Sequence, residues 1–281
     1  MKDKIHLQLC IPNTQFKISI YSADIIFLHI LSEILQPYIY EEKIDNSCID
    51  KQYGNLDTHD IVIGVEGAYK KYKLEENTAI GQTCRILQGI QRSINPWNLY
   101  HGAAMHIKGK TIVFLGDSGT GKTTLIAYLL NTSKESMYLS EDVLIINSEN
   151  NMLIPYPRPL LLRREGKNLL QEKYCISFDY ASCIAYGEYF RYVIKSSSIF
   201  EKKYTVDGYI KLKRNESEHF YVDKIIENRG DTILSSCYLP NNIRNNVISS
   251  IKLANRSRLY EISYSDLDLF AKKLYNIIDL L

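Results

Sequence analysis

Residues 116–123 read Gly-Asp-Ser-Gly-Thr-Gly-Lys-Thr, which has the spacing Gly-x-x-x-x-Gly-Lys-Thr. The glycines of such a segment let the backbone turn several N–H groups toward one anion. The lysine can reach terminal phosphates, and the threonine hydroxyl suits Mg²⁺. The segment is therefore predicted to be a phosphate-binding loop for a nucleoside triphosphate, held by Gly116, Asp117, Ser118, Gly119, Thr120, Gly121, Lys122, Thr123 and Thr124.

The sequence on either side of this segment fits the same prediction. Thr111–Leu115 is a short β-branched and aromatic run, typical of a buried strand. Thr123–Leu130 is apolar, lacks glycine and proline, and is typical of a helix. A mere glycine-rich turn is the alternative, but it leaves the order Gly-Lys-Thr-Thr unexplained. Strand, glycine loop and helix together are the context that phosphate binding requires.

Two adjacent carboxylates, Glu141 and Asp142, interrupt the extended apolar run Met137–Ile146. Acidic residues are depleted from strand interiors, so the pair needs a reason. Magnesium bound to a triphosphate is usually held by one or two carboxylates, and Thr123 with Asp142 would supply protein ligands. Neighbours in a regular strand face opposite sides, so both carboxylates reach the phosphates only if a bend separates two short strands. The alternative is a solvated acidic turn.

One histidine and several arginines are further candidates. The run Leu99–Ile107, the turn Lys108-Gly-Lys and the strand that follows predict a hairpin, which would bring His101 beside the glycine loop. The alternative for His101 is a packed core histidine. Prolines at 155, 157 and 159 force an extended path that displays Arg158, and the segment continues to Arg163. These arginines suit a transferring phosphate or, equally, an exposed surface.

Composition narrows the class of protein. The chain has 281 residues, 45% hydrophobic and 23% charged residues, and a net charge of +2, which is ordinary for a soluble globular protein and does not imply a nucleic-acid partner. The apolar run Ile25–Ile30 is too short for a membrane span, and the N-terminus lacks a signal-peptide core. Six cysteines without a Cys-x-x-Cys pair indicate reduced thiols in a cytoplasmic protein. A homo-oligomer stays open.

The remaining patterns predict two domains. Residues 1–97 form a small α/β accessory domain, with a hairpin over 3–20, a helix over 24–36, a loop over 41–59, a strand over 60–65 and a helix over 82–93. Residues 98–281 hold the chemistry. Their later part is predicted to give strands of a mixed sheet over 170–235, a helix over 243–253, a strand over 258–263 and a last helix that Ser265 caps.

Five segments, in this order, resemble the bacterial HPr kinase/phosphorylase superfamily. They are Leu99-Tyr-His-Gly-Ala-Ala, the loop 116–123, Ser140-Glu-Asp, Pro157-Arg-Pro-Leu-Leu-Leu-Arg and Leu259-Tyr-Glu-Ile-Ser-Tyr. More closely, the chain is similar to the HPr-kinase-like enzymes encoded with peptide-modification clusters, which include the lasso peptide kinases. The resemblance covers residues 98–281. It implies an α/β fold with an α+β mixed sheet, a P-loop kinase core like that of phosphoenolpyruvate carboxykinase.

The resemblance also implies an activity, namely ATP- and Mg²⁺-dependent phosphorylation of a serine in a peptide or protein. A ribosomally made precursor peptide is the expected acceptor. By position, Glu141 matches the first carboxylate of the family's Asp-Asp pair, the general base, although it is Glu here. Asp142 matches the carboxylate that helps with metal and phosphates, and His101 matches the active-site histidine. Lys122 would stabilise the transferring phosphoryl group.

Other activities stay open. The chain lacks the family's characteristic stretch for binding HPr, which disfavours an HPr serine kinase that regulates carbon metabolism, but the site would be the same. A small-molecule kinase would differ only in its acceptor. A regulator that senses ATP without catalysis needs no base, so the acidic pair disfavours it. A GTPase is disfavoured because the chain has no guanine-reading Asn/Thr-Lys-x-Asp motif.

Overall fold

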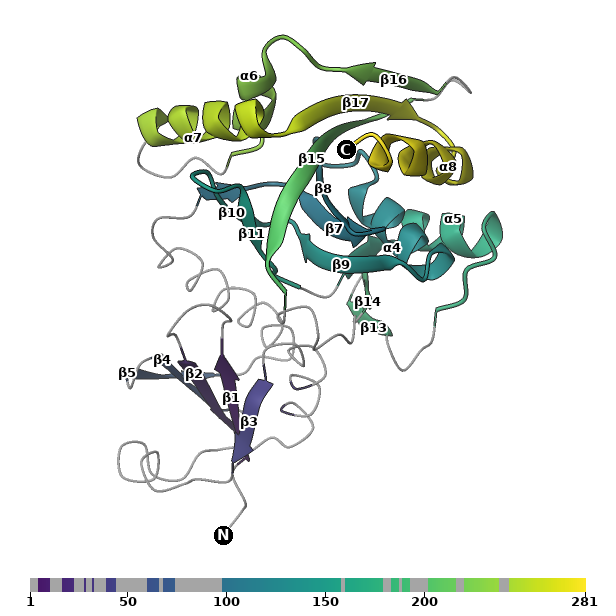
Figure 1. The fold of residues 1–281 in the computed structure, drawn as a ribbon. Coiled ribbons are helices and arrows are strands. Elements are labelled where there is room, and N and C mark those ends of the chain that lie inside the picture. Colours follow the sequence, from purple (N-terminus) through teal and green to yellow (C-terminus); the bar gives the residue numbers. More distant parts are fainter. Residues whose placement is uncertain are drawn as a thin grey trace. The chain divides into compact units, whose positions relative to one another are not determined.

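The computed structural model describes residues 5–10, 17–22, 28, 32, 39–43, 60–65, 68–73, 98–157, 160–178, 183–186, 189–192, 202–215, 220–237 and 243–281. The chain divides into two compact units (Figure 1). The N-terminal unit comprises residues 1–95 with 195–197, and the C-terminal unit comprises 96–194 with 198–281. Among the described helices, none has both the length and the apolar character that crossing a membrane requires.

Five strands in the described part of the N-terminal unit form one antiparallel sheet in the order β3-β1-β2-β4-β5. The strands are β1 (Ile5–Cys10), β2 (Lys17–Ser22), β3 (Ile39–Lys43), β4 (Asp60–Val65) and β5 (Ala68–Lys73). The predicted hairpin and the strand over 60–65 are confirmed. The loop predicted over 41–59 is wrong at its start, because 41–43 pair with β1. Most of the helix predicted over 24–36, and all of that over 82–93, lie outside the described residues.

A nine-stranded mixed sheet forms the centre of the C-terminal unit. Its longest strand, β15 (Tyr204–Arg214), pairs in parallel with β8 (Lys110–Leu115) and β17 (Arg258–Tyr264), and antiparallel with β11 (Met152–Ile154). The sheet also contains β6 (Asn98–Tyr100), β7 (Ala103–Ile107), β9 (Ser136–Glu141), β10 (Leu144–Asn147) and β16 (Tyr221–Lys224). The predicted hairpin over 99–115 is present as β7 and β8.

Helices cover both faces of this sheet, and the alternation of β8 shows why. Ile112 and Phe114 pack with α4 (Lys122–Thr132) and α8 (Leu267–Ile278) in one core cluster. Val113 and Leu115 face the opposite side and share a second core cluster with residues of α6 (Arg229–Leu234) and α7 (Ile243–Arg256). Because neighbours in a strand point to opposite faces, an uninterrupted apolar strand requires this double cover (Figure 1).

A smaller sheet and one further helix complete the C-terminal unit. The antiparallel strands β12 (Leu160–Arg163), β14 (Tyr189–Tyr192) and β13 (Cys183–Tyr186) form the small sheet, and α5 (Arg164–Glu172) follows β12 directly. The prediction that 170–235 adds strands to one mixed sheet is therefore only partly right. β15 and β16 do join the large sheet, whereas β13 and β14 do not, and 229–234 is helical.

Two other predictions concern the C-terminal helices. The helix predicted over 243–253 and the strand over 258–263 are present as α7 and β17. Ser265, however, does not cap the last helix. Asp266 is the N-cap, and its carboxylate accepts a hydrogen bond from the Leu269 N–H at 2.9 Å. Ser and Asp both cap well, and the backbone conformation at Asp266 places the cap one residue after the predicted Ser265.

Candidate functional site

The glycine loop (residues 116–121) connects the buried strand β8 to the N-terminus of α4. Gly121 is the N-cap of α4 and has a φ of 89°, a conformation that side chains disfavour. A Cβ at this position would lie 2.8 Å from the Tyr264 hydroxyl oxygen. Gly121 also has no side chain that could accept hydrogen bonds from the first turn. No side chain caps the N-terminus of α4, so its first-turn N–H groups and the positive end of its dipole suit an anion.

Lys122 folds back onto this loop. Its ammonium donates hydrogen bonds to the carbonyl oxygens of Gly116, at 2.7 Å, and Asp117, at 2.9 Å. Burial lowers the pKa of Lys122, and the nearby carboxylates of Glu141 and Asp142 act against that shift. The loop is thus held by hydrogen bonds to the buried ammonium of Lys122, which lies near the carboxylates of Glu141 and Asp142.

Tyr264 also holds the loop in place by a hydrogen bond. The hydroxyl of Tyr264, at the end of β17, donates to the Thr120 carbonyl oxygen at 2.9 Å. The Thr120 hydroxyl in turn donates to the Asp117 carbonyl oxygen at 2.9 Å. Burial raises the pKa of Tyr264, so its hydroxyl stays a donor at ordinary pH. These contacts fix the backbone of the loop before any ligand binds.

The acidic pair lies where β9 ends and β10 begins. Asp142 sits in a bend with a φ of 63°, so the predicted bend between two short strands is present. Glu141 is 5% exposed and accepts a hydrogen bond from the Thr123 hydroxyl. The bend lets both carboxylates line the same cavity.

The same side chains are also candidate ligands for a metal ion. In the described part of the chain, no group of three or more His, Cys, Asp or Glu residues could hold a metal ion by itself. The hydroxyl of Thr123 and the carboxylates of Glu141 and Asp142 are nevertheless hard oxygen donors that line one cavity. Such a set suits Mg²⁺, which takes one or two carboxylates and completes its shell with water and phosphate.

His101 lies in the bend between β6 and β7, and two contacts place it there. Its backbone N–H donates to the Ser236 carbonyl oxygen at 2.5 Å. The next residue, Gly102, packs so closely on β8 that a Cβ would lie 2.7 Å from the Phe114 carbonyl oxygen. Burial, and then the charge of Lys122, lower the pKa of His101 below its ordinary value of 6.5. The imidazole is therefore neutral at pH 7.

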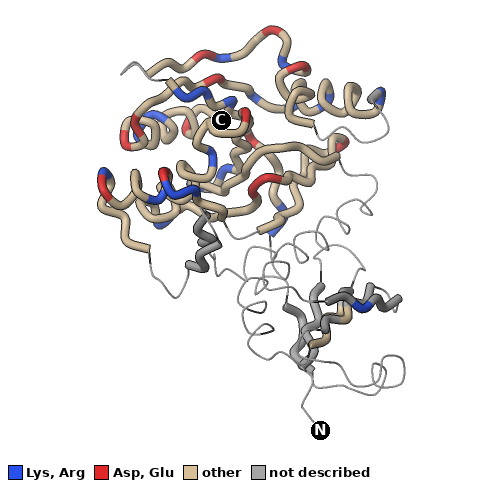
Figure 2. The backbone as a smooth tube through the Cα atoms, turned by 180° about the vertical axis from the view of Figure 1, so that it is seen from behind, with Lys and Arg blue, Asp and Glu red and all other residues tan. Residues whose placement is uncertain are grey.

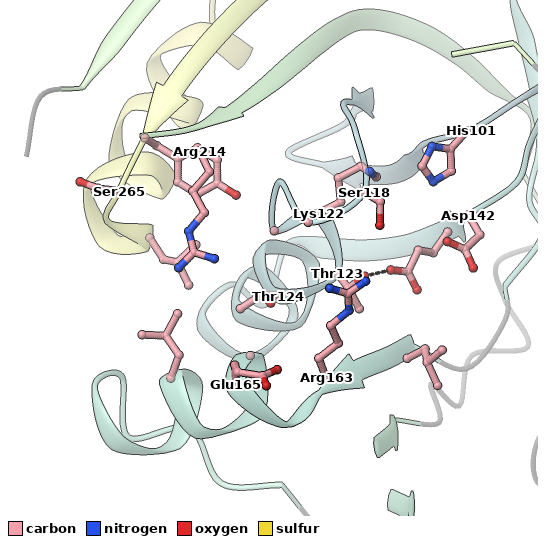
Figure 3. A pocket seen from close by; sticks show the side chains of 18 residues that line it. His101, Ser118, Lys122, Thr123, Thr124, Asp142, Arg163, Glu165, Arg214 and Ser265 are labelled. Carbon is pink, nitrogen blue, oxygen red and sulfur yellow. Dashed lines mark hydrogen bonds between the residues drawn. The ribbon is translucent and has the colours of Figure 1, made fainter. Parts of the chain in front are cut away.

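These groups share one cavity of about 620 Å³, within the usual range for small-molecule sites. Figure 3 shows His101 and Asp142 at one end, Lys122, Thr123 and Thr124 in the middle, and Arg214 and Ser265 at the other end. We call these the acidic end and the arginine end. The cavity is lined by His101, Ser118, Gly119, Gly121, Lys122, Thr123, Thr124, Glu141, Asp142, Leu161, Arg163, Glu165, Gly166, Leu169, Arg214, Tyr264, Ser265 and Leu267.

Most of the predicted site residues thus meet in this cavity. Gly116, Asp117 and Thr120 do not line it and instead support the loop through backbone groups. Arg163 lines it, at the end of β12, whereas Arg158 lies outside the described residues.

Sequence reasoning missed the arginine end almost entirely. Arg214 ends β15 and pairs in register with Tyr264 on β17, 50 residues later in the chain. A lone arginine after an alternating strand has no local signature, and only the parallel pairing brings it to the cavity. The glycine in Arg-Arg-Glu-Gly166 was a weak signal, because a glycine inside a helical pattern costs stability and so suggests a packing reason.

Charge elsewhere on the C-terminal unit is mixed in sign. Figure 2 shows basic and acidic residues interspersed along its described backbone. Several pair with each other, as Lys213 and Lys211 do with Glu261, at 2.6 and 3.5 Å. Among the described residues, the cavity differs from the rest of the surface because charged groups such as Lys122 and Glu141 are buried there. It does not differ by an excess of one sign of charge.

Comparison with known proteins finds a weak likeness in structure. No family model matches the chain, and no curated protein matches it in sequence. Among solved structures, the chain is similar to the Hpr(Ser) kinase/phosphatase from Coxiella burnetii, with a TM-score of 0.32 and 14% sequence identity. The match covers 65% of this chain and 96% of that one.

Proposed function

We propose that the C-terminal unit is an ATP-dependent kinase that transfers the γ-phosphoryl group to a serine hydroxyl of a peptide or protein. The observation that carries the proposal is the meeting of Glu141 with Thr123. A buried carboxylate, hydrogen-bonded to the first turn of the helix behind a Gly-x-x-x-x-Gly-Lys-Thr loop, combines a phosphate site with a proton acceptor.

Each group in the cavity has a separate role in the proposed phosphoryl transfer. The N–H groups of the glycine loop and of the first turn of α4 bind the phosphates, and Lys122 neutralises their charge. Glu141 takes the proton from the hydroxyl of the acceptor serine while the serine oxygen attacks the γ-phosphorus. The new O–P bond forms, the bond between the γ-phosphorus and the β–γ bridging oxygen breaks, and ADP leaves. Neutral His101 donates a hydrogen bond to the phosphoryl oxygens as charge develops on them.

Thr123 and Asp142 would hold Mg²⁺. The ion, when bound, supplies positive charge against the β- and γ-phosphates. Arg163 stands beside this group at the end of β12 (Figure 3) and can add charge on the same side.

For the acceptor we propose a ribosomally made precursor peptide, on the resemblance to the peptide-tailoring kinases. HPr is the alternative within the same chemistry.

Mass spectrometry of candidate acceptors, after incubation with ATP and Mg²⁺, tests the proposal. The set holds HPr and any short precursor peptide encoded beside the gene, each also incubated with Lys122→Ala as the control. One phosphate on a peptide serine, absent with Lys122→Ala, is the expected result. Phosphate on HPr instead would support a regulator of carbon metabolism. Tight ATP binding without phosphate transfer to HPr or to a precursor peptide would refute the proposed kinase activity and would support an ATP sensor.

A further inference from the structure

Tyr264 takes no part in the phosphoryl transfer proposed above, yet its buried side chain contacts the glycine loop directly. The hydroxyl donates to the Thr120 carbonyl oxygen at 2.9 Å, although the two residues lie 144 positions apart in the chain. We infer that Tyr264 is a positioning residue for phosphate binding, which fixes the direction of the Gly121 N–H before a ligand binds. The inference rests on the proposed function, because it takes the glycine loop to bind phosphate.

The geometry of one peptide bond connects this hydrogen bond to phosphate binding. The Thr120 carbonyl and the Gly121 N–H belong to the same planar trans peptide unit, so they point in opposite directions. A hydrogen bond from Tyr264 to the carbonyl oxygen therefore turns the N–H away from Tyr264. Gly121 lines the cavity and is the N-cap of α4, where N–H groups without an intrahelical partner suit an anion.

Two other hydrogen bonds to loop carbonyls come from a group that the ligand itself attracts. Lys122 donates to the carbonyl oxygens of Gly116 and Asp117. Its ammonium is also the group expected to reach the phosphates, so these two bonds compete with the ligand. The Tyr264 hydroxyl is neutral, because burial raises its pKa above the ordinary value of 10. Its bond to Thr120 does not compete with the ligand and fixes the loop both before and after binding.

Gly121 leaves the room that the Tyr264 hydroxyl needs. Gly119 and Gly121, on either side of Thr120, both have a φ of 89°, a conformation that residues with a Cβ disfavour. A Cβ on Gly121 would lie 2.8 Å from the Tyr264 hydroxyl oxygen. Glycine at position 121 thus permits both the left-handed turn and the close approach of the hydroxyl.

The core of the C-terminal unit holds Tyr264 itself in place. The centroid of its ring lies 4.8 Å from that of Phe270, a fully buried residue of α8. Aromatic pairs at this separation stabilise each other beyond the effect of burial. The backbone carbonyl of Tyr264 accepts a hydrogen bond from the Asn215 N–H at 2.9 Å. The hydroxyl therefore reaches Thr120 from a fixed position.

A hydrogen-bond network around Asp266 fixes the chain that follows Tyr264. Asp266 accepts from Lys173 at 2.8 Å and from the Tyr174 hydroxyl at 3.1 Å, both just after α5. The Leu267 N–H donates to the same Tyr174 hydroxyl at 2.9 Å. The start of α8 is thus tied to the end of α5. A site whose parts are fixed in advance loses less entropy when a ligand binds.

Calorimetry with two probes, ATP with Mg²⁺ and inorganic tripolyphosphate, tests the inference. Tripolyphosphate has the phosphate chain but no nucleoside. Tyr264→Phe removes the hydroxyl and keeps the ring. We expect it to weaken the binding of both probes about tenfold, the effect of one lost hydrogen bond, because both probes bind through the loop.

Tyr128→Phe is the matched control. Tyr128 is a buried residue of α4 whose hydroxyl donates to the Asp268 carboxylate on α8, and it does not line the cavity. Its loss should lower the free energy of unfolding at least as much as Tyr264→Phe does, because its partner is charged. Both dissociation constants should stay within about twofold. Equal weakening in the two variants would assign the effect to the packing of α4 on α8 and overturn the inference.

A double-mutant cycle gives a second test. Gly121→Ala places a Cβ against the Tyr264 hydroxyl, so it should weaken tripolyphosphate more in the wild-type background than in the Tyr264→Phe background. Equal effects in the two backgrounds would mean that the two residues act independently, which contradicts the inference.

The remaining outcomes separate the role of Tyr264 from the proposed function. If Tyr264→Phe leaves both probes within about twofold of wild type, the loop does not need this hydrogen bond and the inference is wrong. If the variant weakens ATP alone, Tyr264 acts on the nucleoside and not on the loop, which also overturns the inference. In both cases the proposed function stands, because the wild-type protein binds phosphate. Wild-type protein that binds neither probe would refute the proposed function, and the inference with it.

Discussion

The acidic end and the arginine end of the cavity differ chiefly in their exposure to solvent. Glu141 is 5% exposed and Lys122 is 8% exposed, and each is fixed by hydrogen bonds. Arg214 and Ser265 are exposed. Charges interact more strongly where water is excluded, and exposed charges are screened by salt. The acidic end is therefore suited to act on a reacting group, and the arginine end to attract and hold a ligand.

This difference predicts that changes at the acidic end alter the rate, whereas those at the arginine end alter affinity. The largest effect is expected from Glu141→Gln, which keeps the shape and removes the proton acceptor. Its kcat should fall about 10²- to 10⁴-fold, the usual contribution of a general base, while ATP affinity stays nearly unchanged. Initial rates together with calorimetry measure both. Asp142→Asn is the control, since a larger loss of kcat there would move the base to Asp142.

The next effect is a pH dependence at His101. Since burial and Lys122 lower its pKa below 6.5, the neutral form should persist from pH 8 to 6.5, and kcat/KM should decline only below that. The same shift means that the unfolded chain binds this proton more readily, so stability also decreases as the pH falls below 6.5. His101→Gln should remove the decline in kcat/KM.

His106 serves as the control for this pH profile. Burial also lowers its pKa, but it lies outside the cavity, bonded to the Thr111 hydroxyl at 3.2 Å. His106→Gln should therefore leave the acidic decline of kcat/KM in place. A profile that changes equally in both variants would mean that the decline reports the stability of the fold and not the state of His101.

Smaller effects are expected at the arginine end. Arg214→Gln should raise the KM for ATP about tenfold at low salt, with little change in kcat, because the exposed guanidinium acts mainly by long-range attraction. Raising NaCl to about 0.5 M should shrink the difference, since screening weakens such charges. Rate measurements at the two salt concentrations test this. A salt-independent loss of kcat would contradict the comparison and make Arg214 part of the reacting centre.

The smallest effect concerns stability alone. Asp266→Ala should lower the free energy of unfolding by about 1 kcal/mol, because α8 loses its N-cap. Burial acts to raise the pKa of Asp266, but the bonds from Lys173, the Leu269 N–H and Tyr174 outweigh it and lower that pKa. This stability is thus present above pH 3.8, the ordinary value, and is lost as the pH falls through the lowered pKa.

Ser265→Ala is the matched control for the cap, because sequence alone favoured Ser265. Denaturant melts of both variants at pH 7 should show no loss for Ser265→Ala. A loss at Ser265 equal to that at Asp266 would contradict the assignment of the N-cap.

The part of the site that the sequence predicted is the part that is local. The loop, the strand before it, the helix after it and the acidic bend each depend on fewer than a dozen consecutive residues, whose backbone requirements are visible as residue types. The partners of Thr123 and Thr124 were not visible in the sequence, because they depend on which neighbouring element each side chain meets.

Only the tertiary structure shows the arginine end of the cavity and the hydrogen bonds that hold it in place. Arg214 reaches the cavity through the parallel pairing of β15 with β17, and Gly166 reaches Thr124 through the packing of α5 on α4. The Asp266 network joins residues 92 and 93 positions apart in the chain. Such contacts follow from how whole elements pack, and short-range sequence patterns do not encode the partners. The sequence by itself thus determined a loop and a possible base, and the packing of the sheet and helices made them one cavity.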